Sequence, residues 1–254
     1  MAGRTGTGRV NERFAFDLEA AGGGLVGGAD EAGRGCLAGP LVAAAVSFDY
    51  GRLDDDDFAA LDLLDDSKRL SAAGREALCR EVVKRARQVV VVCCAAATID
   101  RDGLHACNLR ALTRAVERLA PAPAVVLVDG FPLPACSRPH RAVVGGDGRS
   151  AAVAAASVVA KVVRDRLMRA LHERFPQYGF ARHVGYATPE HHAAIAAHGL
   201  CDQHRRSFAS VAYQQLALGL GDGGGPAGGE VGRGGREAAG GAGGNVTGGG
   251  PSAP

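Results

Sequence analysis

Four acidic residues stand at or just after the ends of predicted strands, where a sheet can bring negative charge together. They are Asp30, Glu31, Asp129 and Asp147. Ligands of open α/β sheets gather outside the carboxyl ends of the strands, so we expect these acids to converge on one crevice. In a continuing strand Asp30 and Glu31 would point to opposite faces. The Gly-Arg-Gly sequence at 33–35 predicts a turn, and we expect the strand to end at Asp30 so that both acids approach one point.

Such a cluster predicts a metal site. Four carboxylates stay ionised only when cations neutralise them, because like charges in a low dielectric raise one another's pKa. Oxygen ligands without thiolate or imidazole favour Mg²⁺ or Mn²⁺. Two such ions about 3.5–4 Å apart are the apparatus of in-line displacement at phosphorus. A lone Asp is more often a cap or turn residue, so only the four acids together favour this interpretation.

Five apolar segments that alternate with helical patterns predict the fold class. We expect strands at 25–30, 40–48, 88–96, 124–129 and 141–146. Helices are expected at 71–87, 100–119, 150–174 and 189–198. We expect the first two strands to form an antiparallel pair and the third strand to be buried. Ser71 and Asp100 are the expected N-caps of the first two helices. Strands with helices between and after them predict an α/β fold with a five-stranded mixed sheet flanked by helices.

Composition predicts a globular core with extensions at both ends. Of the 38 glycines, 17 fall in 219–254, which we expect to be a disordered Gly-rich tail. Residues 1–22 are expected to form a flexible N-terminal arm, and 23–218 the folded domain. Charged residues make up 22% of the chain, which excludes a membrane protein. A net charge of +2 neither requires nor forbids a nucleic-acid partner.

The location expected from the sequence is cytoplasmic. The charged start of the chain has no apolar signal core, and seven cysteines without CxxC spacing fit a reducing compartment. Histidines 183, 191, 192, 198 and 204 lack zinc-ligand spacing with cysteines, so we expect solvated or capping roles for them.

Seven segments between residues 25 and 212 carry a family resemblance. They are GADEAGRGCLAGPLVAAAV (28–46), DDSKRLS (65–71), VLVDG (126–130), GGDGRS (145–150), AAASVVAKVVRDRLM (154–168), FPQYGFARHVGYATPEH (175–191) and HRRSF (204–208). With these segments in family order, the chain resembles bacterial ribonuclease HII. The resemblance implies a ribonuclease H-like fold with a C-terminal helical extension, which makes 23–218 the catalytic domain.

The resemblance also implies an activity. The expected reaction is metal-dependent cleavage of the RNA strand of RNA–DNA hybrids, extended to single ribonucleotides embedded in duplex DNA. The cut falls 5′ to the ribonucleotide and leaves 3′-hydroxyl and 5′-phosphate ends. The family's acidic tetrad falls on the four acids named above. Its Gly-Arg-Gly that reads the ribose 2′-hydroxyl falls on Gly33, Arg34 and Gly35, and its sugar-packing tyrosine falls on Tyr186.

Further residues fit a nucleic-acid substrate. Ser157, Lys161 and Arg164 share one face of the predicted helix at 150–174, positioned to meet phosphates, although a solvated basic stripe is the plainer interpretation. Lys68 precedes the Ser71 cap and is expected to meet an anion there. Glycines at 33 and 35 let the backbone approach a minor groove, where the 2′-hydroxyl is displayed.

Two positions depart from the family pattern. Gly145 stands where the family usually has lysine, two residues before the fourth acid, which predicts an altered phosphate contact or charge balance. Cys36 replaces a small residue or proline, and we expect this change to be tolerated.

Two alternatives fit the same residues: a non-catalytic nucleic-acid-binding module, against which the intact tetrad argues, and a relative that prefers long hybrids to single ribonucleotides. A monomer is the family expectation. No short clamp-binding motif is obvious at the C-terminus, and a sliding-clamp partner is left undetermined.

Overall fold

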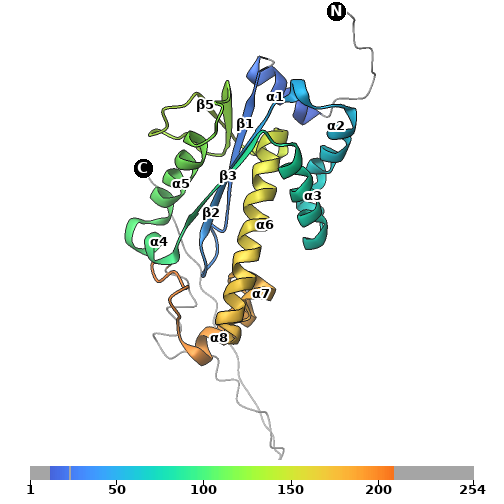
Figure 1. Ribbon diagram of the computed structural model, residues 1–254. Helices are drawn as coiled ribbons and strands as arrows, with labels where there is room; N and C mark the ends of the chain where they lie inside the picture. The colour runs from blue at the N-terminus through green and yellow to red at the C-terminus, as the bar shows by residue number, and fades with distance from the viewer. Residues whose placement is uncertain (1–11, 23, 209–254) are drawn as a thin grey trace, which may run out of the picture. The chain divides into compact units, whose positions relative to one another are not determined.

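One five-stranded mixed sheet forms the centre of the computed structural model, which describes residues 12–22 and 24–208 (Figure 1). Its strand order is β3-β2-β1-β4-β5. The strands are β1 (Val26–Ala32), β2 (Leu41–Phe48), β3 (Gln88–Cys94), β4 (Val125–Asp129) and β5 (His140–Val143). β2 is antiparallel to β1 and β3, whereas β4 is parallel to β1 and β5. The predicted mixed sheet and the antiparallel first pair are confirmed.

Helices cover both faces of this sheet (Figure 1). The long helix α6 (Ala151–Arg174) packs on one face, and α3 (Ala72–Arg85) packs against α6. The other face is covered by α5 (Leu104–Glu117). Helix α6 approaches β1 so closely that a Cβ atom at Gly28 would lie 2.0 Å from the carbonyl carbon of Ala152. The alanine-rich start of α6 and this glycine therefore bring the helix directly onto the strand that carries Asp30.

The start of α6 is fixed by two side chains. Ser150 accepts from the Val153 amide at 3.1 Å, an N-cap that satisfies one of the orphan donors of the first turn. The buried Asp17 accepts from the Ala152 amide at 2.8 Å. Asp17 belongs to helix α1 (Glu12–Ala21), so this part of the expected arm is a packed helix. Residues 1–11 and the expected tail at 219–254 lie outside the described residues.

Three segments differ from the predicted elements. The helix expected at 100–119 is two helices, α4 (Ala96–Asp102) and α5, which meet at Gly103 with φ +83°. The strand expected to be buried is β3, an edge strand that is mostly half-buried. No helix was predicted at the acidic run 54–57, which begins helix α2 (Asp55–Leu61) with a capping box formed by Asp54 and Asp57.

The remaining helical segments follow α6. They are the 3₁₀ turn η4 (Pro176–Tyr178), α7 (Phe180–His183) and α8 (Pro189–His198). Earlier 3₁₀ turns are η1 (Tyr50–Arg52), η2 (Asp62–Arg69) and η3 (Gly146–Gly148). Ser71 caps α3 as predicted, accepting from the Gly74 amide at 3.1 Å. Within the described ranges, no helix combines the length and apolarity that crossing a membrane requires.

Candidate active site

The two neighbouring acids lie inside β1. Asp30 pairs with Ala44 and Glu31 with Ala43, and the strand continues to Ala32. The expected end of the strand at Asp30 is therefore wrong, and the pleat sends the two side chains to opposite faces. Asp30 faces α6, and Glu31 faces α5.

Asp30 is almost completely buried, with 7% of the residue exposed. Burial raises its pKa from near 3.8 to about 8, and the charges of Glu31 and Asp129 add to that rise. A hydrogen bond from the Ser157 hydroxyl on α6 opposes it. The carboxylate is thus held where its ionised form is disfavoured, which is the electrostatic condition for attracting a cation.

Glu31 has one partnered and one unpartnered carboxylate oxygen. Arg34 Nη1 lies 3.2 Å from Glu31 Oε1. Oε2 is buried and has no hydrogen-bond partner within the described part of the chain. Burial raises the pKa of Glu31, while Arg34 and the Asn108 side chain from α5 oppose the rise. A buried carboxylate oxygen without a partner is costly, so this atom points to a ligand.

Asp129 ends β4, parallel to β1, and its charge raises the pKa of both Asp30 and Glu31. Its Oδ1 accepts from the Gly146 amide at 2.6 Å. That hydrogen bond ties the 3₁₀ turn η3, which carries Asp147, to the end of β4. β5 ends at Val143, so Asp147 lies on this turn and not within two residues of a strand.

The carboxylates do not form a closed metal cage. Across residues 12–22 and 24–208, no group of three or more His, Cys, Asp or Glu side chains is arranged to hold a metal ion. Asp30, Glu31 and Asp129 nevertheless interact through their charges. Their hard oxygen donors and the unpartnered Glu31 Oε2 fit a divalent ion such as Mg²⁺ or Mn²⁺.

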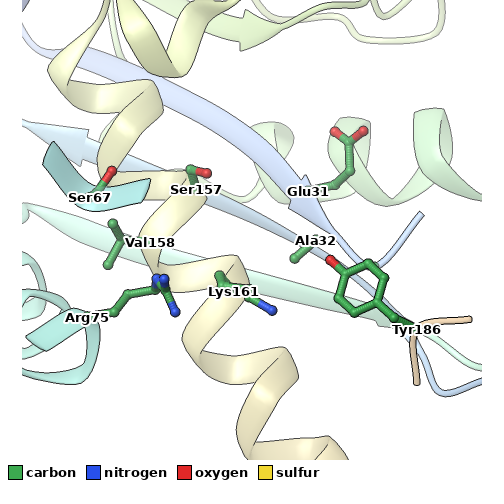
Figure 2. A pocket seen from close by; sticks show the side chains of 9 residues that line it. Glu31, Ala32, Ser67, Arg75, Ser157, Val158, Lys161 and Tyr186 are labelled. Atoms are coloured by element: carbon green, nitrogen blue, oxygen red, sulfur yellow. The ribbon is translucent and has the colours of Figure 1, made fainter. Parts of the chain in front are cut away.

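A pocket of about 340 Å³ opens beside Glu31 (Figure 2). It is lined by Glu31, Ala32, Gly33, Ser67, Arg75, Ser157, Val158, Lys161 and Tyr186. Five of these residues were predicted from the sequence as site residues: Glu31, Gly33, Ser157, Lys161 and Tyr186. Ser67 and Arg75 were not predicted as site residues, although Ser67 lies in the segment 65–71 that carries the family resemblance and could have indicated it.

Gly33 and Gly35 have different surroundings. A Cβ atom at Gly33, whose φ is +94°, would lie 2.0 Å from Arg164 Nε. A Cβ atom at Gly35 would meet nothing within 4 Å, and Gly35 is exposed. There is therefore space at Gly35 for the expected close approach of a nucleic acid to the backbone. At Gly33 the space left by the missing side chain is filled by Arg164.

Arg164 is not available to phosphates as expected. It is fully buried, and its guanidinium donates to the carbonyl oxygens of Ala38, Pro40 and Val184 at 2.8–3.1 Å. The helical spacing was correct, but the helix turns this position inward beneath the loop at 33–40.

Lys161 and Tyr186 do face the pocket. Lys161 Nζ pairs with Asp165 at 2.8 Å and lies 5.5 Å from the centre of the Tyr186 ring (Figure 2). Tyr186 is 42% exposed. The Lys68 side chain lies outside the described residues. Cys36 is buried, and burial raises the pKa of its thiol, so it packs as a small apolar residue.

Comparison with known proteins decides the family. A model of the family "Ribonuclease HII" matches residues 27–211. The chain belongs to the ribonuclease HII family. It is an endoribonuclease of the ribonuclease H class that acts on RNA–DNA hybrids.

Individual relatives agree with this assignment. A curated ribonuclease HII from Geobacillus thermodenitrificans is 49% identical over 199 residues, covering 78% of this chain and 74% of the relative. The ribonuclease H2 of Pyrococcus horikoshii has a TM-score of 0.65 at 22% identity, covering 77% of this chain and 98% of that one. A solved complex of Bst-RNase HIII with Mn²⁺ has a TM-score of 0.61 at 22% identity, covering 86% and 76%. The two solved structures show the shared ribonuclease H-like fold.

Proposed function

We propose that this ribonuclease HII hydrolyses phosphodiesters with two divalent ions held by Asp30, Glu31, Asp129 and Asp147. The observation that carries the proposal is a buried, mutually repelling carboxylate group in which Glu31 Oε2 lacks a partner among the described residues. Mg²⁺ or Mn²⁺ would supply the counter-charge and activate water for in-line displacement. The Mn²⁺ complex of the RNase HIII neighbour supports that choice of ion.

The chain's own residues then have defined tasks. Ser157 holds the Asp30 carboxylate, and the Gly146 amide holds Asp129. Arg34, stacked 4.6 Å from the centre of the Phe131 ring, keeps the side chain of Glu31 in place. These contacts limit the rotamers of three ligands, which is the preorganisation that a metal site needs.

The substrate class follows from the loop beside the acids. We assign reading of the ribose 2′-hydroxyl to Gly33, Arg34 and Gly35, with Gly35 as the open approach. Tyr186, on the pocket wall, packs against the neighbouring sugar, and Lys161 meets a phosphate. The enzyme is thus proposed to cut 5′ to single ribonucleotides embedded in duplex DNA as well as long hybrids, leaving 3′-hydroxyl and 5′-phosphate ends. It is proposed to do so as a monomer.

One cleavage gel tests this function. The enzyme is incubated with a labelled duplex that contains one ribonucleotide, and separately with a long RNA–DNA hybrid, each with Mg²⁺, with Mn²⁺ or with a chelator. We expect a single cut on the 5′ side of the ribonucleotide only when an ion is present. Asp129→Asn should bind the duplex nearly as tightly as the parent while cleavage collapses.

A matched control removes a carboxylate elsewhere. Glu117 on α5 accepts from Ser137 and takes no part in the proposed site, so Glu117→Gln should cut at the parental rate. Full activity of Asp129→Asn would remove Asp129 from the ion site. Cleavage of the long hybrid alone would restrict the substrate class.

A further inference from the structure

Two fully buried arginines lie beneath the loop at 33–40. Arg164 and Arg205 are both 0% exposed. Within residues 12–22 and 24–208, neither forms an ion pair with a carboxylate, and both donate to backbone carbonyls. A buried guanidinium is costly unless its donors are satisfied, so two of them under one loop require an explanation.

Arg164 holds the second half of the loop. Its Nε donates to the Pro40 oxygen at 3.1 Å and its Nη2 to the Ala38 oxygen at 3.1 Å. Its Nη1 donates at 2.8 Å to the Val184 oxygen, two residues before Tyr186. This arginine therefore joins the loop to the segment that carries the pocket tyrosine.

Arg205 reaches the first half of the loop. Its Nη1 donates to the Arg34 oxygen at 3.1 Å and its Nε to the Gly39 oxygen at 3.0 Å, while its Nη2 has no hydrogen-bond partner among the described residues. The backbone amide of Arg205 donates to the Leu37 oxygen at 2.8 Å, so both the backbone and the side chain of Arg205 form hydrogen bonds with this loop. The guanidinium is thus the contact that fixes the peptide between Arg34 and Gly35.

The orientation of that peptide determines what the pocket side meets. In a planar trans peptide the C=O and the N–H point in opposite directions. Because the Arg34 carbonyl points inward to Arg205, the Gly35 N–H points away from the interior. Gly35 is exposed, and a Cβ atom there would meet nothing within 4 Å. The outward amide is therefore placed where a hydroxyl acceptor can reach it.

We propose that Arg205 is a positioning residue for ribose recognition: it fixes the Arg34–Gly35 peptide so that the Gly35 N–H faces the 2′-hydroxyl of the substrate. The inference rests on the proposed role of this loop in reading that hydroxyl. Arg205 itself does not touch the substrate and acts only through the backbone. Arg164 supports the remainder of the loop from the same side.

The experiment measures equilibrium binding to two duplexes that differ by one 2′-hydroxyl. All proteins carry Asp129→Asn so that no cleavage occurs. The Asp129→Asn parent should bind the ribonucleotide duplex more tightly than the all-DNA duplex. Adding Arg205→Lys, which keeps the charge but loses the planar fork, should lower this preference about fivefold, the equivalent of one neutral hydrogen bond.

A matched control and a second variant separate positioning from folding. Arg138 also donates to a backbone carbonyl, that of Glu117 at 2.9 Å, near the opposite end of β4. Arg138→Met should leave the preference unchanged. Arg205→Met should lower it at least as much as Arg205→Lys. Unfolded molecules bind neither duplex, so partial unfolding lowers both affinities by one factor and leaves their ratio intact.

The outcomes distinguish the inference from the function on which it rests. If the Asp129→Asn parent itself shows no preference for ribose, the proposed reading of the 2′-hydroxyl is wrong. If the parent prefers ribose and both Arg205 variants keep the parental ratio, the positioning role is overturned and Arg205 is only a structural residue.

Discussion

Two buried polar regions of this enzyme are built in opposite ways. In β1 and at the end of β4, the charges of Glu31 and Asp129 add to the raised pKa of Asp30, the charge of Asp129 adds to that of Glu31, and Glu31 Oε2 lacks a partner among the described residues. Beneath the loop at 33–40, five of the six guanidinium nitrogens of Arg164 and Arg205 donate to backbone carbonyls, and Arg205 Nη2 is left without a partner among the described residues.

The difference separates a binding region from a supporting one. A buried network whose donors are mostly satisfied makes its surroundings rigid, whereas a group of buried carboxylates with an unpartnered oxygen favours a ligand that completes it. The arginine region therefore fixes the loop, and the carboxylate region keeps its negative charge for an ion. Changes to the two regions should affect stability with opposite signs.

Asp30→Asn tests the carboxylate side and should give the largest effect. The folded protein holds the Asp30 proton up to a pKa of about 8, whereas the unfolded chain releases it near 3.8. Ionisation therefore destabilises the folded state increasingly from pH 4 to 8, and fully above pH 8. We expect cleavage to fall at least about a hundredfold. In chelator at pH 8.5, the free energy of unfolding should rise by about 1 kcal/mol or more.

Denaturant titration with and without Mn²⁺ checks this prediction. Saturating Mn²⁺ should stabilise the parent more than the variant, since an ion that binds only the folded state adds to its stability. A variant that is less stable than the parent in chelator would mean that the fold itself satisfies this carboxylate.

Gly33→Ala and Gly35→Ala form a matched pair on the arginine side. At Gly33 the φ of +94° and the 2.0 Å approach to Arg164 Nε oppose any side chain. We expect Gly33→Ala to lower the free energy of unfolding by about 2–4 kcal/mol. Gly35→Ala meets open space, so its stability should be parental while affinity for the ribonucleotide duplex falls. Equal destabilisation by both substitutions, measured by chemical denaturation, would contradict this assignment.

The contrast between these glycines also shows what the sequence predicts and what it does not. The mixed sheet, the helix at 150–174 and the Ser71 cap follow from local patterns, because periodicity and capping depend on nearby residues. The strand that carries Asp30 continues to Ala32 because its backbone pairs with β2, a long-range contact. The turn signal at 33–35 alone could not predict that extension.

The sequence predicts a site residue when its chemical type is unusual for its position along the chain. It fails when long-range packing determines what the side chain does. Acids near strand ends predict a group of Asp30, Glu31, Asp129 and Asp147, and the charges of the first three interact in the structure. That the four hold metal ions stays a prediction. Arg164 has the same helical spacing as Lys161, and only the packing of the loop at 33–40 makes it a buried donor. Likewise, histidines expected to be solvated or to act as caps include His183, His191 and His204, which are buried.

Those histidines give a third prediction, on pH. His191 Nδ1 donates to the Tyr186 carbonyl at 2.8 Å, so its Nε2 must accept from His204 Nε2 at 3.2 Å while both rings are neutral. Burial lowers the pKa of each from 6.5 to about 4. Between pH 6.5 and 4 these two rings therefore bind protons in the unfolded chain but not in the folded state. The free energy of unfolding falls as the pH drops through this range. Each ring should contribute about 1 kcal/mol of loss between pH 7 and 5.5.

Chemical denaturation across this pH range measures the slope. Buried Asp17 and Asp30 titrate with the opposite sign, because burial raises their pKa, so slopes are compared between variants. His204→Asn should flatten the loss, and His105→Asn at an exposed site should leave it parental. An unchanged slope in His204→Asn would place the acid sensitivity elsewhere.

Gly145→Lys introduces the lysine that the family resemblance predicts at this position. It acts at the border of the carboxylate region and should have the smallest effect. Gly145 has φ +61° and ψ +40°, where an L-residue costs about 1 kcal/mol, and a Cβ atom there would meet nothing within 4 Å. We therefore expect a loss of stability of about that size without a clash. The new cation lies two residues from Asp147, so duplex binding should strengthen at low salt, and the slope of log affinity against log salt should steepen by about 1. Gly145→Gln carries the same backbone strain without the charge. If Gly145→Gln steepens the salt dependence as much as Gly145→Lys, the change does not come from a phosphate contact made by the lysine.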